Sequence, residues 1–242
     1  MKDSRRLRYY NQKRSIGDKW NSWFLRLSIT GWLILINVVF FIIVFPMLYL
    51  DQDTIRYVAL QPSSFFNNLF LWTLLTSMFM HGGIFHLLIN MFVLFSLGGL
   101  CEKIIGRKRY LAFYLISGII AGLMFVSLAF AFGNTPLGER IFASPETFAV
   151  GASGAIFAIA GLFMILTPRL RFSIIFLPFF SLPAYIMIPL VLFATWLVSS
   201  SAGFGVGNTA HLGGFLAGVF YGLYLKHKYK KKTKLIARYF SG

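Results

Sequence analysis

Charged residues are scarce in this chain of 242 residues, and acidic residues are the scarcest of them. Only 12% of the residues are charged, 7 are Asp or Glu, and 57% are hydrophobic. The mean hydropathy is +0.72. Soluble globular domains carry about twice that charged fraction. The composition therefore excludes an ordinary soluble domain and indicates a polytopic membrane protein.

The sequence has little cysteine, and its first residues do not match a signal peptide. The single cysteine, Cys101, excludes a disulfide within the chain, and its place at the end of an apolar stretch indicates a packed thiol rather than a catalytic one. Residues 1–26 are basic and lack the compact apolar segment and small-residue cleavage site of a signal peptide. We therefore expect the first apolar stretch to stay in the protein as a membrane anchor.

Long stretches without charge predict six membrane-spanning helices, because a helix needs about 20 apolar residues to cross the hydrocarbon. These charge-free intervals are 27–50, 57–101, 110–138, 147–168 and 172–225. The first, third and fourth intervals hold one span each, and the second holds one at roughly 83–100. The last holds two spans that are separated by a break at 199–207. Pro178, Pro183 and Pro189 are expected to interrupt the regular hydrogen bonding of the first of these two, the fifth span. The expected fold is an all-α bundle of six transmembrane helices.

The basic residues predict the orientation of this bundle. Of the 23 Lys and Arg residues, 21 lie in 1–26, 101–109, 169–171 and 226–242. The alternate loops contain only Arg56 and Arg140. Because basic loops stay on the cytoplasmic side, both termini are expected there. We expect a basic N-terminal tail over 1–26, a membrane domain over 27–225 and a basic C-terminal tail over 226–242. With no further domain beyond these tails, a prokaryotic plasma membrane is the expected location.

The formal net charge of +16 does not indicate a nucleic-acid-binding protein. Its basic residues are confined to tails and turns beside apolar spans, and no motif interleaves them with aromatic residues. They are topology signals for a protein whose surroundings are a lipid bilayer. No nucleic-acid partner is expected.

Three short motifs place polar side chains within these apolar stretches, where such side chains are costly and usually functional. The motifs run from His81 to Asn90, from Gly151 to Gly154 and from Ala210 to Gly214. His86, Ser153 and His211 each stand 15 residues before the cytoplasmic edge of their span. At about 1.5 Å per residue, all three side chains are expected at one depth, roughly 22 Å above that edge.

Two more polar residues belong to the first motif. Asn90 follows His86 by four residues, so both share one helical face. His81 precedes His86 by five residues, lies off that face, and is expected in the loop that leads into the span.

Ser153 and His211 form the minimal pair for nucleophilic acyl transfer if their helices touch. Gly151 and Gly154 leave room around the serine, and the N-terminal end of its helix favours a developing anion. Small residues also recur every three or four positions on both helices, which allows close backbone approach. They are Gly154, Ala158 and Gly161 on one helix and Ala210, Gly214, Gly218 and Gly222 on the other. No Asp or Glu lies within a predicted span, so a dyad is expected rather than a triad.

Taken together, these motifs resemble those of the rhomboid family of intramembrane serine proteases. The resemblance covers roughly residues 70–225 and rests on the spacing of His81, His86 and Asn90, on Gly-x-Ser-Gly at 151–154, and on Ala-His-x2-Gly-x3-Gly at 210–218. It implies a rhomboid-like bundle in which the long loop after the first span, residues 51–80, lies partly in the membrane as short helices.

The resemblance also implies a role for each site residue. Ser153 would be the nucleophile, and His211 would act as general base and then as general acid. His86, Asn90 and the backbone N–H of Ser153 would hold the oxyanion. Supporting positions would be Gly151, which shapes the same pocket, and Phe157, which packs on the base. The implied reaction is cleavage of transmembrane segments of single-span or polytopic proteins near the outer membrane boundary, without a metal or other cofactor.

Three alternative hypotheses remain open at this point. The first is a catalytically inactive rhomboid-like protein that binds and escorts membrane clients, although both members of the dyad are present. The second is a transporter or channel, against which the lack of inverted repeats and of intramembrane carboxylates argues. The third is a metal site built from His81, His86 and His211, a set that departs from the usual zinc ligands.

Overall fold

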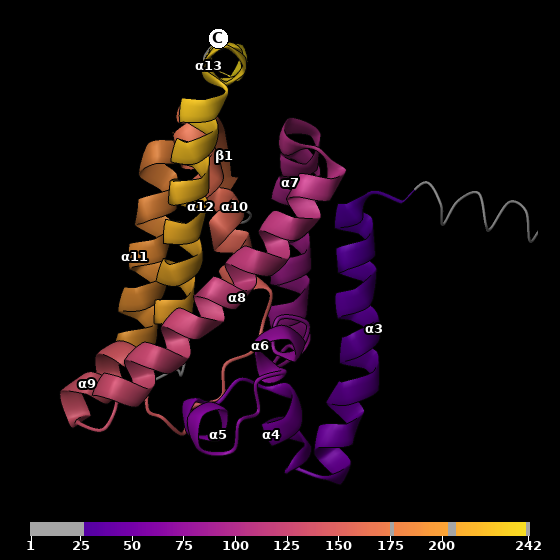
Figure 1. Ribbon diagram of the computed structural model, residues 1–242, viewed down its shortest axis with the longest axis vertical. Coiled ribbons are helices and arrows are strands. Elements are labelled where there is room, and N and C mark those ends of the chain that lie inside the picture. Colours follow the sequence, from indigo (N-terminus) through magenta and orange to yellow (C-terminus); the bar gives the residue numbers. More distant parts are fainter. Residues whose placement is uncertain (1–26, 175–176, 203–206, 241–242) are drawn as a thin grey trace, which may run out of the picture.

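The computed structural model describes residues 27–174, 177–202 and 207–240, and helices dominate these residues. Six long helices run along the bundle (Figure 1). They are α3 (Ile29–Leu50), α7 (Ile84–Ile105), α8 (Arg107–Phe132), α10 (Ser153–Leu166), α11 (Ala184–Ala202) and α12 (Asn208–Lys228). Each falls in one of the six predicted spans, so the predicted helical membrane fold is confirmed. The basic tail predicted over 1–26 lies outside the described residues.

Shorter helices connect or extend the long ones. They are α4 (Thr54–Val58), α5 (Pro62–Asn67), α6 (Thr73–Thr76), α9 (Pro136–Phe142) and α13 (Lys230–Tyr239). The first three lie in the loop after α3, where short helices were predicted. At the upper end of the bundle in Figure 1 lie the α7–α8 turn and α13. We call this end, with residues 101–109, 169–171 and 226–238, the basic end.

The long helices differ in how well they match the thickness of a membrane. By length and hydropathy, residues 29–48, α7 and α8 are each long and apolar enough to cross it, whereas α10 and residues 184–199 form shorter apolar helices. With 14 residues, α10 is only about 21 Å long, less than the roughly 30 Å of the hydrocarbon core. Its first residue, Ser153, therefore lies below the membrane surface opposite the basic end.

One segment differs from the prediction. Residues expected to begin the fifth span instead form an antiparallel hairpin of β1 (Arg171–Ile174) and β2 (Leu177–Pro183), in which Phe172 pairs with Leu182. Two of the three prolines expected to interrupt that span, Pro178 and Pro183, lie in β2, and only Pro189 lies within α11. Proline lacks the N–H that a helix interior needs, so the chain stays extended until Ala184.

The centre of the bundle is α10, which packs against α7, α8, α11 and most closely α12. A Cβ atom at Gly214 would overlap the carbonyl of Gly154, and one at Gly218 would overlap the carbonyl of Ala158. The predicted contact between the two small-residue faces is therefore present. It brings the backbones of α10 and α12 together over most of their length.

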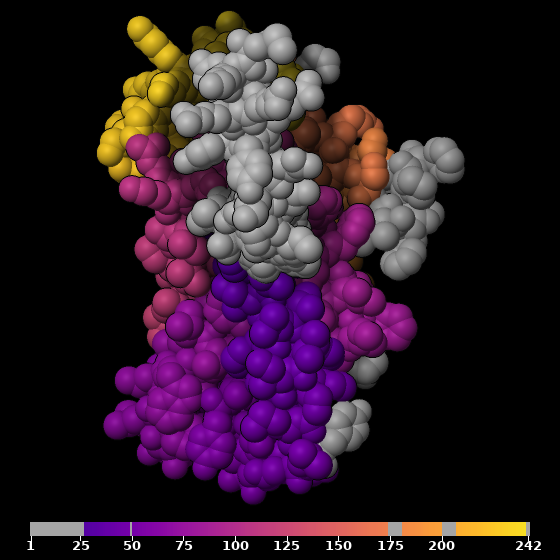
Figure 2. Space-filling model, turned by 90° about the vertical axis from the view of Figure 1, so that its right-hand side faces the viewer, coloured from indigo at the N-terminus to yellow at the C-terminus, as the bar shows by residue number. Residues whose placement is uncertain are grey.

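The first helix, α3, lies at the edge of the bundle and packs mainly on α7. Its outer side covers much of the face seen in Figure 2 and carries exposed apolar side chains, among them Ile42 and Ile43. At the basic end, α7 continues beyond its predicted limit to Ile105, so the buried Glu102 lies within the helix. The Glu102 carboxylate accepts hydrogen bonds from the backbone N–H groups of Ile29 and Thr30, at 3.0 Å each.

Candidate active site

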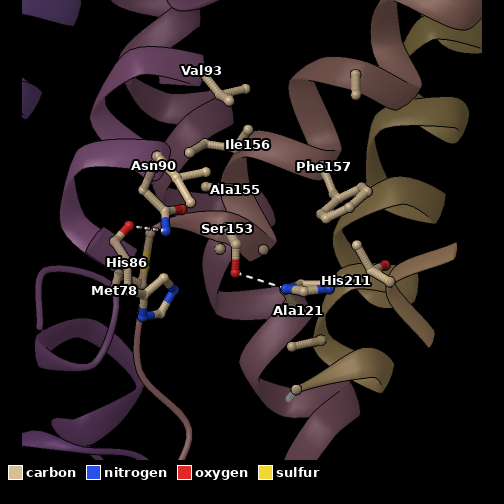
Figure 3. A pocket seen from close by; sticks show the side chains of 18 of the residues that line it. Met78, His86, Asn90, Val93, Ala121, Ser153, Ala155, Ile156, Phe157 and His211 are labelled. Carbon is tan, nitrogen blue, oxygen red and sulfur yellow. Dashed lines mark hydrogen bonds between the residues drawn. The ribbon is translucent and has the colours of Figure 1, made fainter. Parts of the chain in front are cut away.

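Ser153 and His211 meet between α10 and α12. Ser153 is the first residue of α10, and His211 lies in the first turn of α12. The Ser153 Oγ lies 2.8 Å from the His211 Nε2, at hydrogen-bonding distance (Figure 3). The close packing of the two small-residue faces places this pair, as the sequence predicted. The arrangement is that of a nucleophile next to a base.

The His211 ring is held by packing rather than by a carboxylate. Phe157, one turn after Ser153, stacks on the ring with centroids 4.6 Å apart and planes at 29°. The ring is 8% exposed, and its Nδ1 has no hydrogen-bond partner among the described protein atoms. In the tautomer that accepts the Ser153 hydroxyl proton at Nε2, Nδ1 carries the ring hydrogen. The stacking of Phe157 therefore restricts the orientation of the His211 ring.

His86 faces the same hollow from the start of α7. The backbone N–H of Gly82 donates to the His86 Nδ1 at 3.4 Å, so in the neutral ring Nε2 carries the hydrogen. A Cβ atom built on Gly151 would lie 3.0 Å from this Nε2. Gly151 also has a φ of +123°, a conformation that side chains disfavour. The missing side chain thus leaves an N–H donor open toward the space beside Ser153.

Asn90 and the end of α10 add further donors. The Asn90 Nδ2 donates one hydrogen to the backbone carbonyl of His86 at 2.9 Å, which leaves its second N–H free for another acceptor. Asn90 is 5% exposed and lines the same cavity as Ser153. The backbone N–H of Ser153 belongs to the first turn of α10, where no intrahelical acceptor exists. These groups can stabilise a negative charge beside the serine.

His81 lies in the loop before α7, as predicted, but the structure brings it against the site. Its ring is fully buried and meets the ring of His86 edge-on, with centroids 5.1 Å apart. Burial and, to a lesser extent, the nearby His86 lower the pKa of His81 to about 4, against a smaller opposing contribution from the backbone of Phe79. His81 is therefore neutral at neutral pH and buttresses His86.

A cavity of about 1340 Å³ opens beside these residues. Ser153, His211, His86 and Asn90 all line it, and apolar side chains of α7 and α11 form two of its walls, among them Phe92 and Val191. It extends along α10 as far as Phe172 and Ser173 in β1. A cavity with apolar walls and a few converging polar groups suits an extended or helical apolar segment.

Gly154 serves mainly the packing of the helices. It lines the cavity, but a Cβ atom there would lie 2.8 Å from the Cβ of Ala121 on α8. Its lack of a side chain therefore lets α10 approach α8.

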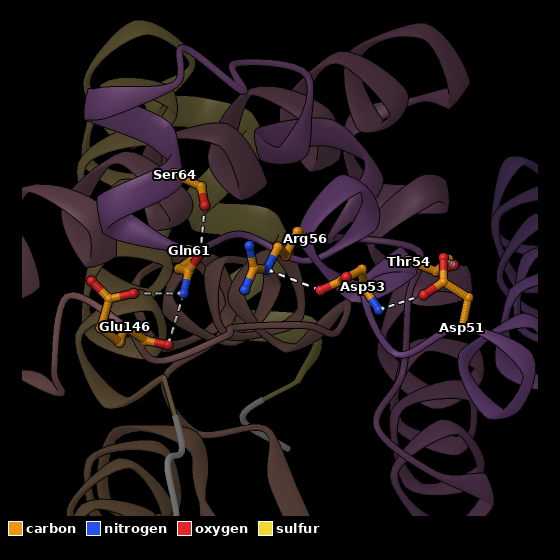
Figure 4. Close-up of polar contacts among 7 residues, drawn as sticks. All are labelled: Asp51, Asp53, Thr54, Arg56, Gln61, Ser64 and Glu146. Atoms are coloured by element: carbon orange, nitrogen blue, oxygen red, sulfur yellow. Dashed lines mark hydrogen bonds and ion pairs between the residues drawn. The ribbon is translucent and has the colours of Figure 1, made fainter.

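Hydrogen bonds to a second loop hold the segment before Ser153, and the sequence analysis did not predict them. Residues 59–65 and 144–151 lie side by side, joined by an antiparallel bridge between Leu60 and Ala149. The Gln61 Nε2 donates to the Glu146 carboxylate at 3.0 Å, and the Ser63 hydroxyl donates to the same carboxylate at 2.9 Å (Figure 4 shows the Gln61 contacts). Because the partners lie more than 80 positions apart in two loops, no periodic pattern indicates the pairing.

The geometry does not support the metal hypothesis. Within the part of the chain that the structure describes, no group of three His, Cys, Asp or Glu side chains is arranged to hold a metal ion. His211 faces Ser153, whereas His81 packs against His86, so the three histidines do not converge on one point.

Comparison with known proteins agrees with the motifs. The family model of the Rhomboid domain matches residues 68–228. The chain is 31% identical over 214 residues to the presenilin-associated rhomboid-like protein, mitochondrial, of Homo sapiens, covering 84% of this chain and 51% of that protein. It is 34% identical over 156 residues to RHOMBOID-like protein 5 of Arabidopsis thaliana, covering 64% of this chain and 44% of that protein. The chain spans about half the length of the curated relatives it matches. With two thirds of its residues inside the matched domain and the three motifs gathered around one cavity, the chain belongs to the rhomboid family.

Proposed function

We propose that this protein is an intramembrane serine endopeptidase that uses Ser153 and His211 as a catalytic dyad. The observation that carries the proposal is the 2.8 Å contact between the Ser153 Oγ and the His211 Nε2 beside a cavity with apolar walls. Family membership supports the same reaction class. The relatives' names state no activity.

In the proposed reaction, the Ser153 Oγ attacks the carbonyl carbon of a peptide bond while its proton passes to the His211 Nε2. The carbonyl oxygen becomes an oxyanion, which accepts hydrogen bonds from the His86 Nε2–H, the second Asn90 N–H and the Ser153 backbone N–H. His211 then returns the proton to the leaving amine as the C–N bond breaks. A water molecule, activated by His211, hydrolyses the acyl-enzyme and frees Ser153.

The proposed substrate is a transmembrane segment of a single-span or polytopic membrane protein. The walls of the cavity between α7 and α11 are apolar, which suits a side chain arriving from lipid. We propose lateral entry past α11. A helical segment must unwind locally before Ser153 reaches its carbonyl, so cleavage is expected near helix-breaking residues at the outer membrane boundary.

The membrane and orientation are also part of the proposal. The apolar helices identify an integral membrane protein. By the distribution of Lys and Arg, the basic end faces the cytoplasm or the equivalent compartment. The expected prokaryotic plasma membrane gains no support from the comparisons, because the matched animal relatives carry the description mitochondrial.

A serine-directed fluorophosphonate tests the dyad directly. We expect the purified protein to be labelled in detergent, and labelling to disappear in both Ser153→Ala and His211→Ala. Ser96→Ala is the matched control, because Ser96 lines the same cavity but donates to the Phe92 carbonyl of its own helix at 2.8 Å. Equal labelling of all four proteins would refute the dyad.

Cleavage must then be measured in a bilayer. The protein is reconstituted with a single-span substrate that carries a helix-breaking residue near its outer boundary, and products are identified by mass spectrometry. We expect cleavage by the wild type and by Ser96→Ala, and none by Ser153→Ala. The alternative is a client-binding protein. It would be supported if protein that reacts with the fluorophosphonate bound the substrate specifically and saturably but did not cleave it.

A further inference from the structure

The last described helix, α13, changes direction where the bundle ends. The chain leaves α12 after Lys228, and Tyr229, with φ −121° and ψ 45°, interrupts the helix. The next ten residues, Lys230–Tyr239, form α13. In Figure 1, α12 runs along the vertical axis whereas α13 is seen nearly end-on, so α13 lies across the bundle axis. An element that crosses the axis at this point runs along the membrane surface.

The side chains of α13 are sorted onto three sides. Thr233 is buried, and Ile236 is partly buried toward the bundle. A second side is basic, because at 100° per residue four exposed cations fall within an arc of about 100°. They are Lys230, Lys231, Lys234 and Arg238, whereas the fifth cation of α13, Lys232, is exposed beside Tyr239. Between these two sides, Leu235 and Tyr239 are 69% and 80% exposed. The uncovered apolar pair therefore lies beside a dense row of cations.

Other basic groups at this end extend the positive surface. Lys108 and Arg109, in the first turn of α8, are exposed. The Arg109 guanidinium lies 5.5 Å from the ring centroid of Tyr229 and donates to its hydroxyl at 3.4 Å, so α8 and the α12–α13 junction present their charges together. Among the described residues of this end the acidic side chain is Glu102, which is buried and occupied by α3 and Arg107. Within the described part of this end, no exposed acidic side chain neutralises the positive surface.

We propose that α13 is an interfacial helix that binds the anionic phospholipid headgroups of the leaflet at the basic end. The four cations of its basic side lie at the level of the phosphates, and Leu235 and Tyr239 dip into the boundary of the acyl chains. Each Lys or Arg near an anionic surface strengthens the attraction to it, and the exposed apolar pair adds burial to this attraction. Three features of α13 fit a lipid surface: its charge, its direction along the membrane surface and its uncovered apolar pair.

The test places an environment-sensitive fluorophore at the apolar pair. The full chain, with Cys101→Ala and Leu235→Cys, is labelled with nitrobenzoxadiazole and reconstituted in nanodiscs. One set contains only phosphatidylcholine, and the other contains phosphatidylglycerol in addition. We expect the emission to shift to shorter wavelengths, and quenching by a lipid-borne nitroxide to increase, only in the discs with phosphatidylglycerol. The shift should weaken at 1 M salt, where the Debye length falls to about 3 Å.

Matched charge variants complete the experiment. Lys231→Gln together with Lys234→Gln should abolish the effect of phosphatidylglycerol. Arg56→Gln together with Arg140→Gln, which removes two cations at the opposite end of the bundle, should leave it unchanged. An identical shift in both kinds of disc, or one that requires two copies of the chain in a disc, would overturn the proposal in favour of a protein contact. Neither readout depends on peptidase activity.

Discussion

At the scale of single residues, the site depends on which ring nitrogen of each histidine carries the hydrogen. His86 accepts from the Gly82 N–H at Nδ1, which leaves its Nε2–H directed toward the space beside Ser153. His211 has the opposite requirement, because its Nε2 must accept the proton of Ser153. Two imidazoles with opposite tautomers therefore face Ser153 from two sides. One can donate to an oxyanion while the other removes a proton.

A substitution at Gly151 tests the role of the His86 Nε2–H as a hydrogen-bond donor. Replacement by Ala would place a methyl group 3.0 Å from the His86 ring and strain the backbone at φ +123°. We expect Gly151→Ala to lower kcat at least about tenfold, equivalent to about 1.4 kcal/mol of transition-state stabilisation. Steady-state cleavage of a reconstituted substrate measures this. The control is Gly83→Ala, whose Cβ would meet no atom within 4 Å and whose φ of 165° suits any residue. Equal kcat values for both variants would contradict the role of Gly151.

His81 makes stability depend on pH. Its pKa is lowered to about 4 in the folded protein from an ordinary value of 6.5, so the unfolded chain binds the proton more readily. The folded state therefore loses stability as pH falls from about 6.5 toward 4, by an amount on the order of 3 kcal/mol in total. Thermal unfolding in detergent between pH 4 and 7 should show a steeper loss for the wild type than for His81→Gln. Parallel pH profiles would contradict this assignment.

At the scale of elements, the contact between α10 and α12 determines whether the dyad forms. A Cβ atom at Gly218 would overlap the backbone carbonyl of Ala158, and a rigid carbonyl cannot move aside as a side chain does. The two helices would have to separate along the face that also carries Ser153 and His211.

We therefore expect Gly218→Ala to destabilise the protein by about 1–3 kcal/mol and to reduce fluorophosphonate labelling of Ser153. Gly99→Ala provides the control, because a Cβ atom at Gly99 in α7 would meet nothing within 4 Å. That change should be neutral, or stabilising by up to about 1 kcal/mol, through helix propensity. Unfolding midpoints and labelling rates measure both effects. Destabilisation by Gly99→Ala as large as that by Gly218→Ala would contradict the packing argument.

The elements also show which features a sequence can predict. Ser153, His211 and His86 were placed at one depth from residue counts alone, because the rise per residue of a helix and the thickness of the hydrocarbon are both fixed. The small-residue faces of α10 and α12 predicted their contact for a similar reason, since helical periodicity decides which residues share a face.

Contacts between loops and other irregular segments leave no periodic pattern in the sequence. The β1–β2 hairpin, the contact of His81 with His86 and the bond from Gln61 to Glu146 were therefore not predicted. Each depends on where the helices carry the ends of two loops. Pro178 and Pro183 did indicate that a regular helix is interrupted there, but not that the chain folds back as strands.

At the scale of the whole molecule, α3 stands outside the group of helices that builds the site. It packs mainly on α7, whereas α10, α12, α8 and α7 surround Ser153. At the basic end, the buried carboxylate of Glu102 attaches α3 to α7. It accepts hydrogen bonds from the N–H groups of Ile29 and Thr30 and forms an ion pair with Arg107 at 3.5 Å. The carboxylate thus supplies acceptors to free N–H groups at the start of α3 and opposes the positive end of its dipole.

Substitutions at Glu102 therefore test whether the attachment of α3 can be weakened without disturbing the helices around Ser153. We expect Glu102→Ala to leave the N–H groups of Ile29 and Thr30 without acceptors, at a cost of about 3 kcal/mol, and Glu102→Gln to cost less because one amide oxygen remains. Hydrogen exchange should accelerate at residues 29–31 in the order wild type, Gln, Ala, whereas fluorophosphonate labelling of Ser153 persists in all three. Glu139→Ala, at an exposed position in α9, should change neither readout. Loss of labelling in Glu102→Ala without faster exchange at residues 29–31 would show that this carboxylate supports the site itself rather than the attachment of α3.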